Sequence, residues 1–443
     1  MMPLRDLDDC FEGVIPSIIA TTAADGTPNI SYLSQVVMVD DAHIAISNQF
    51  FAKTAANIRA NPHACLLLVS ARHGGQYKLD ITWVSSRDEG PLFKRVADHL
   101  RASSAQVGMA GIMRLKAIDV FRVDDIVPVV SPAGTDHAGD ASPAPDLAVL
   151  GQVMKTISAQ SDTEGVMGAV LDGCAQLGFP HAIVLQSDPI RRLLTTVVSR
   201  GYGRSGVGSE VAFDEGLIGI AAVTRRPVKV NDLSRIRRLG NAIEATSPAD
   251  ENRTRIIVLP SLPDAMSQMA VPMLAQDTLR GVLFVESSER IAFRTAHETT
   301  LEMIASQCAL ALALCEALVP DARPSVLRTV PGLPDDRVIH VTHHAVDDSV
   351  FIDNAYVIKG VAGRLLAYML GVYINEGRNA FSNREIRLAE ALRLPEIKDN
   401  LETRMLLLRR RLGEKNLPVQ LIHAGRGQVR LVVDGVPVLM RAG

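Results

Sequence analysis

The sequence has none of the long apolar runs that mark membrane-spanning or exported chains. No run of about 18 apolar residues without a charge occurs. The N-terminal residues MMPLRDLDDC also place acids where a signal peptide needs basic residues and an apolar run. We therefore expect a cytoplasmic protein that makes no membrane contact.

Cysteine is scarce, and no C-x-x-C pair occurs, which argues against a disulfide framework and a thiolate zinc site. We predict no structural metal. Two of the cysteines, Cys308 and Cys315, are seven residues apart in a helical pattern and share one face, which favours a buried seam over a redox pair. The five cysteines are Cys10, Cys65, Cys174, Cys308 and Cys315.

Low-complexity tracts and internal repeats are also missing, so the chain is no fibrous or solenoid protein. Its 47% hydrophobic and 21% charged residues are typical of globular domains that bury a core. Because 443 residues exceed one ordinary core, about three domains are expected. The predicted class is multidomain α+β.

Residues 1–130 read mostly as short strands separated by turn signals such as Asp25-Gly26 and Asp40-Asp41. This pattern predicts an antiparallel split β-barrel with two helices, over 53–61 and 92–101. Residues 131–146 are rich in Pro, Gly, Ser and Asp and are predicted to be a linker.

Residues 147–318 predict an α/β sandwich flanked by helices. A long amphipathic helix is expected from Leu147 through Leu177 and a closing helix over 295–318, with strands over 182–186, 194–198, 268–273 and 281–286. Four prolines between Pro320 and Asp336 then predict a second linker over 319–337.

Residues 338–443 open with a strand pair, VFIDNAYVI, followed by helices over 363–375, after Ser382 and over 396–412, and by the strands VQLIHA and QVRLVVD. Helices followed by a terminal hairpin are the order of a winged helix. From Lys359 onward, 15 basic and 8 acidic residues give a net charge of +7. Because the whole chain has a net charge of −3, the preceding residues carry −10. A basic module after an acidic body points to nucleic acid as a partner.

The clearest chemical feature is the stretch from Ser47 to Asn57, where a strand gives way to a helix near Lys53. Unpaired backbone N–H groups and the helix dipole favour a phosphate at such a place. Lys53 and Thr54 add an ammonium and a hydroxyl, and Ser47 and Gln49 add further donors. The alternative is an amphipathic helix with a solvated lysine.

At these residues the first domain resembles the pyridoxamine phosphate oxidase-like FMN-binding split barrels. The resemblance covers about Phe11 to Val130 and includes Ala20-Thr21-Thr22, DGTPNISY, Lys53-Thr54-Ala55-Ala56-Asn57 and Asn61-Pro62. It implies that Ser47, Gln49, Lys53 and Thr54 hold the FMN phosphate, that backbone near Ser34 to Val37 lines the ring, and that the protein is a homodimer.

The resemblance leaves the chemistry open, because its members include oxidases, reductases, haem-handling proteins and cofactor sensors. Tyr77, Lys78 and Trp83 could border a pocket, although a tyrosine and a tryptophan on alternating strand positions are more often core or dimer interface. Haem is the alternative cofactor, with His43, His63 and His73 as ligands or else as structural histidines.

The middle domain resembles the GAF family of small-molecule sensors over about Asp146 to Leu318. The residues that carry this are Phe213 to Gly219, the run Arg226 to Asp232, and Ala270 to Met273 with Gly281 to Leu283. GAF pockets hold cyclic nucleotides, tetrapyrroles, haem or nothing, so the ligand here is unknown. A ligand-free dimerising scaffold, in which the 295–318 helix packs across a dimer, is the alternative.

The last domain looks like the winged helix of response-regulator-type transcription factors, over about Val350 to Val433. In its basic helix Leu401, Met405, Leu408 and Leu412 form one stripe. The arginines expected at the surface to contact DNA are Arg404, Arg410 and Arg411 in the helix and Arg426 and Arg430 in the hairpin. The alternative is a winged helix that contacts protein.

Three functions follow from these resemblances. The first is a flavin-binding, redox- or ligand-responsive transcription regulator with DNA as its output. The second is an FMN-dependent oxidoreductase whose other two domains serve assembly. The third is a haem-dependent enzyme or sensor. The sequence names no catalytic residue.

Overall fold

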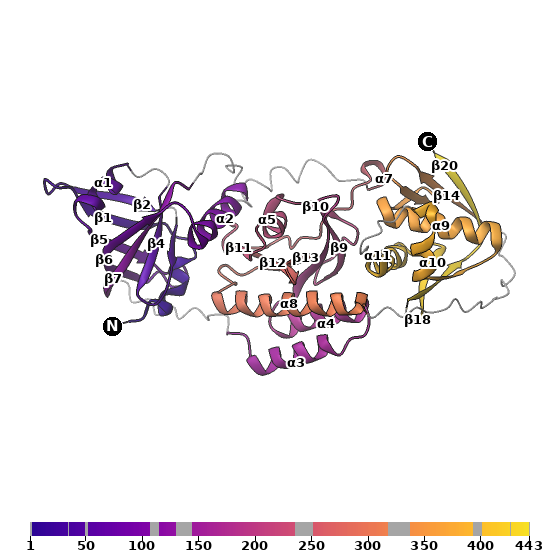
Figure 1. The fold of residues 1–443 in the computed structure, drawn as a ribbon, viewed down its shortest axis with the longest axis horizontal. Coiled ribbons are helices and arrows are strands. Elements are labelled where there is room, and N and C mark those ends of the chain that lie inside the picture. The colour runs from indigo at the N-terminus through magenta and orange to yellow at the C-terminus, as the bar shows by residue number, and fades with distance from the viewer. Residues whose placement is uncertain are drawn as a thin grey trace.

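The computed structural model describes residues 2–33, 35–48, 52–106, 115–129, 144–234, 251–317, 337–392, 401–425 and 427–442. These residues form three units in a row, with the middle unit between the other two (Figure 1). The multidomain α+β class predicted from the sequence is confirmed.

The first unit is an antiparallel seven-stranded sheet that curls into a half-barrel, in the order β2-β1-β5-β6-β7-β4-β3. Alternating burial along β1 shows why these residues form strands, since every second side chain enters the core. The elements are η1 (Leu4–Phe11), β1 (Ser17–Thr22), β2 (Pro28–Leu33), β3 (Val36–Met38), β4 (His43–Asn48), α1 (Ala52–Ala60), β5 (His63–Val69), β6 (Gln76–Arg87), α2 (Pro91–Gln106) and β7 (Ala117–Val129).

The middle unit is a six-stranded antiparallel sheet in the order β10-β9-β8-β13-β12-β11. Three helices cover one face of this sheet, and α5 covers the other. A separate apolar cluster lies on each face. The elements are α3 (Leu147–Ser158), α4 (Thr163–Gln176), β8 (His181–Asp188), β9 (Leu193–Arg200), β10 (Glu210–Ala212), α5 (Gly216–Thr224), β11 (Val228–Val230), α7 (Glu251–Thr254), β12 (Ser267–Ala275), β13 (Thr278–Ser287) and α8 (Thr295–Ala317).

The prediction of one helix from Leu147 through Leu177 is wrong, because the chain forms α3 and α4 there. Asp162 caps α4 by accepting a hydrogen bond from the Gly165 N–H at 2.8 Å. An aspartate at such a position favours a helix start over a helix interior. The two helices then pack together, with Gly173 against Val153.

Among the described helices, α8 is long and apolar enough to cross a membrane by length and composition. It instead packs against α3, α4 and β12 inside the middle unit. Cys308 and Cys315 are both buried on this inner face, as the predicted seam requires.

The last unit has a four-stranded sheet, β16-β15-β14-β20, and a three-stranded sheet, β17-β19-β18. The sequence predicts the β15–β16 hairpin, but it does not predict that the final strand β20 pairs parallel with β14. The elements are β14 (Val338–His344), β15 (Ser349–Ile352), β16 (Ala355–Ile358), α9 (Gly360–Glu376), β17 (Ala380–Ser382), α10 (Asn383–Leu388), η2 (Glu390–Leu392), α11 (Leu401–Glu414), β18 (Val419–Gly425), β19 (Gln428–Val433) and β20 (Val436–Ala442).

Two interior glycines of α9, Gly363 and Gly371, provide a test of the packing of this unit. A Cβ at Gly363 would lie 1.9 Å from the Asp348 carbonyl oxygen, whereas a Cβ at Gly371 has no atom within 4 Å. Gly363→Ala should therefore lower the unfolding free energy by about 1–3 kcal/mol. Gly371→Ala should raise it by about 0.5–1 kcal/mol, because alanine favours the helix. Urea unfolding of both full-length variants measures this, and equal midpoints would contradict the packing.

Candidate functional site

The predicted phosphate-binding lysine lies in the first turn of α1, close after the end of β4. Lys53 is exposed, and its charge acts on the Asp25 carboxyl in the turn before β2, whose pKa is lowered by hydrogen bonds from Thr27 and, to a smaller extent, by Lys53. The first turn of α1 carries no acidic residue. An exposed ammonium beside the positive end of a helix dipole suits a phosphate group. Gln49, predicted beside it, lies outside the described residues.

Thr54, the next residue of α1, belongs to a polar cluster that joins the helix to β1 and β2. Asn29 donates from Nδ2 to Thr54 Oγ1 at 3.1 Å, and the Ser31 and Thr54 hydroxyls are 2.9 Å apart. One turn later, Asn57 donates to Thr21 Oγ1 at 3.1 Å. These bonds hold α1 on the sheet. Because the Thr54 hydroxyl already forms hydrogen bonds with Asn29 and Ser31, a ligand would have to share it with them.

Ser47, at the end of β4, is buried, and its hydroxyl donates to the Gln35 carbonyl oxygen at 3.2 Å. The Gln35 side chain is 7% exposed, and its Oε1 accepts no hydrogen bond from any described residue. A buried acceptor of this kind is costly without a donor. Gln35 lies in the segment whose backbone was predicted to line a flavin ring, and a contribution from its side chain was not predicted. Ser34, in the same segment, lies outside the described residues.

The aromatic side chains proposed at a pocket border lie against the core of the first unit. Tyr77 and Trp83 are partly buried and pack against its apolar cluster. Lys78 pairs instead with Asp80 at 3.4 Å. The structural interpretation of the two aromatics therefore fits this half-barrel.

The three histidines considered as haem ligands each have a local partner. His43 Nδ1 is 2.9 Å from Asp40 Oδ1, His63 Nδ1 is 3.1 Å from Thr82 Oγ1, and His73 accepts from the Gly75 N–H. In the part of the chain that the structure describes, no group of three or more His, Cys, Asp or Glu side chains is placed to hold a metal ion.

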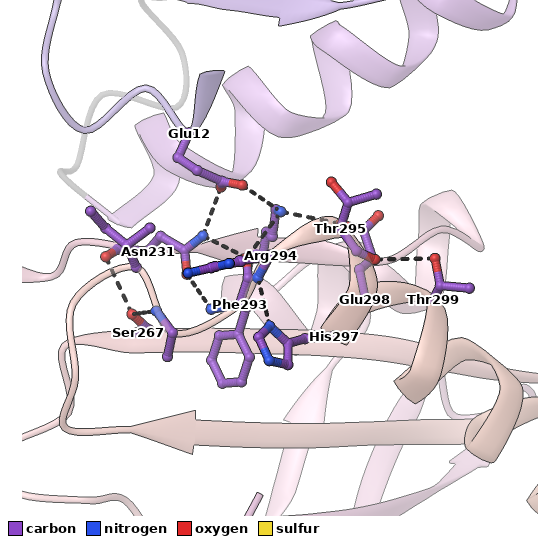
Figure 2. A network of polar contacts seen from close by, with 12 residues as sticks. Glu12, Asn231, Ser267, Phe293, Arg294, Thr295, His297, Glu298 and Thr299 are labelled. Atoms are coloured by element: carbon purple, nitrogen blue, oxygen red, sulfur yellow. Dashed lines mark hydrogen bonds and ion pairs between the residues drawn. The ribbon is translucent and has the colours of Figure 1, made fainter. Parts of the chain in front are cut away.

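The first and middle units meet at a buried network around Glu12, which follows η1 (Figure 2). Its carboxylate accepts from Lys229 Nζ at 2.9 Å and from Asn231 Nδ2 at 2.7 Å. The side chains of Glu12 and Lys229 are only 9% and 14% exposed. Burial alone would lower the pKa of Lys229, but the Glu12 and Glu298 carboxylates outweigh the effect of burial and raise this pKa.

This network also explains a stretch noticed in the sequence, Arg226 to Asp232. Lys229 and Asn231 both donate to the Phe293 carbonyl oxygen, at 3.1 and 2.8 Å. Arg226 donates to the Pro91 carbonyl oxygen of α2 at 3.3 Å. The stretch thus joins two units. Glu12 was missed because its partners lie more than 200 positions later in the chain.

The middle and last units meet along α11, through ion pairs between its arginines and acids of the middle unit. Arg404 lies 3.5 Å from Asp188, at the end of β8. Arg409 and Arg410 both pair with Glu164 in the first turn of α4. Burial lowers the pKa of Arg410, and Glu164 opposes that effect. Part of the basic face of α11 is therefore covered.

The surface positions predicted for the DNA-contacting arginines need correction. The stripe of Leu401, Met405, Leu408 and Leu412 is buried as predicted, but Leu406 and Leu407 are buried too, because α11 packs on the middle unit as well. Arg411 is 5% exposed and donates to the Val357 carbonyl oxygen at 2.9 Å, so it is structural. Arg430 on β19 is half-buried, and Arg426 lies outside the described residues.

The first two units each match the model of a known family. Residues 6–124 match the model of the family described as pyridoxamine 5'-phosphate oxidase, and residues 160–313 match that of the GAF domain. The first unit is thus similar to the pyridoxamine 5'-phosphate oxidase family, and the middle unit, called the GAF domain below, is similar to the GAF family. Among curated proteins, none is significantly similar to the chain.

Similar solved structures cover the same two units. An FMN-binding protein from Syntrophomonas wolfei is 18% identical over 29% of this chain and 87% of its own, with a TM-score of 0.25. The GAF domain of an Acinetobacter phosphoenolpyruvate-protein phosphotransferase is 17% identical over 40% and 97%, with a TM-score of 0.32. Free methionine-R-sulfoxide reductase from Neisseria meningitidis is 16% identical over 39% and 90%, with a TM-score of 0.31.

Removal of Glu12 tests the junction between the first two units. Glu12→Ala leaves Lys229 with Glu298 and a carbonyl as its partners, so the unfolding free energy should fall by about 1–3 kcal/mol. Asp41→Ala is the control, because it breaks the Arg5–Asp41 pair, whose side chains are 65% and 60% exposed, and such a pair contributes little. Thermal unfolding compares the variants, and equal effects would contradict the assigned role of Glu12.

Proposed function

We propose that the chain is a flavin-binding regulator with FMN in the first unit and a DNA-binding last unit. The observation that carries the proposal is the pairing of α11 arginines with acids of the GAF domain, since it makes access to the basic helix depend on domain docking. A regulator needs such an element with two arrangements.

The residues of the first unit fit FMN. Lys53 would hold the phosphate, supported by the α1 dipole and by the Thr54 hydroxyl, with Gln49 as a further predicted donor. Ser47, also predicted, would join them only by giving up its hydrogen bond to the Gln35 carbonyl oxygen. Gln35 Oε1 would accept an N–H of the ring, which satisfies a buried acceptor without a described partner. Bound FMN supplies one- and two-electron redox chemistry.

The last unit has the element order of a winged helix. Three helices, α9, α10 and α11, precede the β18–β19 hairpin, and β17 pairs with β19. In such modules the helix before the hairpin enters the major groove. This order supports α11 as the helix that reads DNA, with Arg404 and Arg410 from the predicted set and Arg409 beside them.

DNA and the GAF domain would then compete for the same arginines. Phosphate contacts need these cations free, whereas Asp188 and Glu164 neutralise them in the docked arrangement. The docked chain is the form with low DNA affinity, and release of α11 raises it. A change of flavin state acts as a signal only if it alters the docking free energy.

A second copy of the chain is the proposed partner of α8. Met303, Leu310 and Leu314 are 44%, 50% and 56% exposed. Their spacing of seven and four places them on one face of the helix. An exposed apolar stripe of this kind supports a homodimer in which the two α8 helices pack together.

Lys53→Ala tests the FMN site. Loss of a charge-assisted contact to phosphate of about 1.5–3 kcal/mol should weaken FMN binding about 10- to 100-fold. The fold should survive, because Lys53 is exposed. Arg59→Ala, which removes a cation from the last turn of the same helix, should retain FMN. Flavin absorbance per protein after desalting measures both, and full flavin content in Lys53→Ala would refute the assignment.

A second experiment tests the docked helix. In full-length protein, Glu164→Gln with Asp188→Asn removes the acidic partners and should raise affinity for duplex DNA about tenfold, as expected for the loss of partly exposed ion pairs. Adding Arg409→Gln and Arg410→Gln should abolish the gain. Fluorescence anisotropy at several salt concentrations measures this. Unchanged DNA affinity after loss of the acids would rule out control by docking.

A further inference from the structure

A cavity of about 330 Å³ lies between the GAF domain and the last unit. The GAF side contributes the end of β8 and the turn that follows it, from Gln186 through Arg191, together with residues of β9, β10 and β13. The last unit contributes the first turn of α9 and two residues of α11. The cavity is thus formed at strand ends and by the neighbouring unit.

The charged side chains of the cavity favour an anion. Arg191 and Lys359 share one carboxylate, Glu210, at 3.0 Å each. The other two cations of the lining, Arg404 and Arg280, each pair with one acid. Arg191 and Lys359 therefore carry two positive charges against the single negative charge of Glu210. The excess positive charge of the cavity lies at this pair. An anion placed there would complete the arrangement.

The N-terminus of α9 points to the same conclusion. This helix runs for 17 residues from Gly360, its N-cap Lys359 makes no side-chain cap bond, and its first turn carries no acid. Lys359, Val361 and Ala362 line the cavity. N–H groups of a first helical turn have no partner within the helix, and the dipole there favours negative charge.

Gly360 itself adopts a φ of +67°, which suits glycine, and a Cβ there would lie 3.4 Å from Arg191 Nη1. The backbone and the guanidinium therefore approach each other closely at the place where the excess positive charge lies.

A buried hydroxyl supplies an independent observation. Ser187 lines the cavity and is 8% exposed, and its Oγ has no hydrogen-bond partner among the residues that the structure describes. A buried hydroxyl without a partner is costly, and a ligand oxygen would satisfy it. The remaining wall is apolar, formed by Pro189, Ile190, Ile358 and Leu407.

We infer that this cavity binds a compact organic carboxylate with a small apolar or aromatic body. The carboxylate lies toward Arg191, Lys359 and the α9 N-terminus, and the body lies against the apolar wall. Because both units form the walls, a bound ligand stabilises the docked arrangement. Binding stands apart from the proposed function, whereas its effect on DNA affinity rests on it.

Titration calorimetry of the full-length protein tests the site with benzoate, phenylacetate and hexanoate, each beside its carboxamide of nearly equal shape. At least one carboxylate should bind with one site per chain and about tenfold or more tighter than its amide. If no carboxylate of the series saturates the protein at millimolar concentration, or if amides bind equally well, the inference is wrong.

Arg191→Gln locates the binding. Glu210 keeps Lys359 as its partner in this variant, so the fold should persist with an unchanged unfolding midpoint. The affinity for the best carboxylate should fall about tenfold, as expected for one charge-assisted contact. Arg204→Gln removes an exposed arginine outside the cavity and should bind like the parent protein. Equal affinity in both variants would place the ligand elsewhere and overturn the assignment.

Two further measurements separate this site from the proposed function. Lys53→Ala should bind the carboxylate with parental affinity, because its change lies in another unit. Saturating carboxylate should also lower the DNA affinity of the parent chain. Carboxylate binding without any DNA binding would refute the regulator and leave the site intact, whereas DNA binding without carboxylate binding would do the reverse.

Discussion

The pairing of α11 arginines with carboxylates of the GAF domain is the interaction on which the proposed regulation depends. Glu164 is 47% exposed and Asp188 20%, so these ion pairs remain partly solvated. Pairs of this kind contribute about 0–1 kcal/mol each, and salt weakens them. The electrostatic part of the docking is therefore small enough for a ligand or a change in flavin state to offset.

The junction at Glu12 has the opposite character. Lys229 is held by two carboxylates and a carbonyl, and its side chain is almost fully buried. Separation of the first two units would leave this charge or its partners without compensation unless water replaced every contact. The first two units are thus coupled through buried charge, whereas the last unit docks through partly solvated ion pairs together with the apolar contacts of Leu406 and Leu407.

Sequence patterns predicted those elements whose signal is local. The alternating strands of the half-barrel and the apolar stripe of α11 are examples, since each reports one buried face. The break between α3 and α4 also has a local signal, because Asp162 in Gln160-Ser161-Asp162 is a good N-cap residue. The helical periodicity on both sides of it nevertheless led to the prediction of one continuous helix.

Glu12, the parallel pairing of β20 with β14, the second buried face of α11 and the acceptor on Gln35 could not be predicted in this way. Each depends on residues far apart in the chain that only folding brings together. For Arg411 the sequence was misleading, since an arginine in a basic run reads as surface until its carbonyl partner, Val357, is known. A charge pattern along one helix cannot reveal which unit covers that helix.

The sheet of the GAF domain gives the two junctions a physical connection. Its edge strands are β11 and β10. Lys229 on β11 contacts the first unit, and Glu210 on β10 contacts Lys359 of the last unit. A flavin-dependent change would have to cross this sheet, whereas a ligand in the interdomain cavity acts directly where α9 and α11 dock. Coupling between two sites is reciprocal. If the flavin state changes the affinity of the cavity for its ligand, the bound ligand must therefore shift the equilibrium between the flavin states by the same free energy.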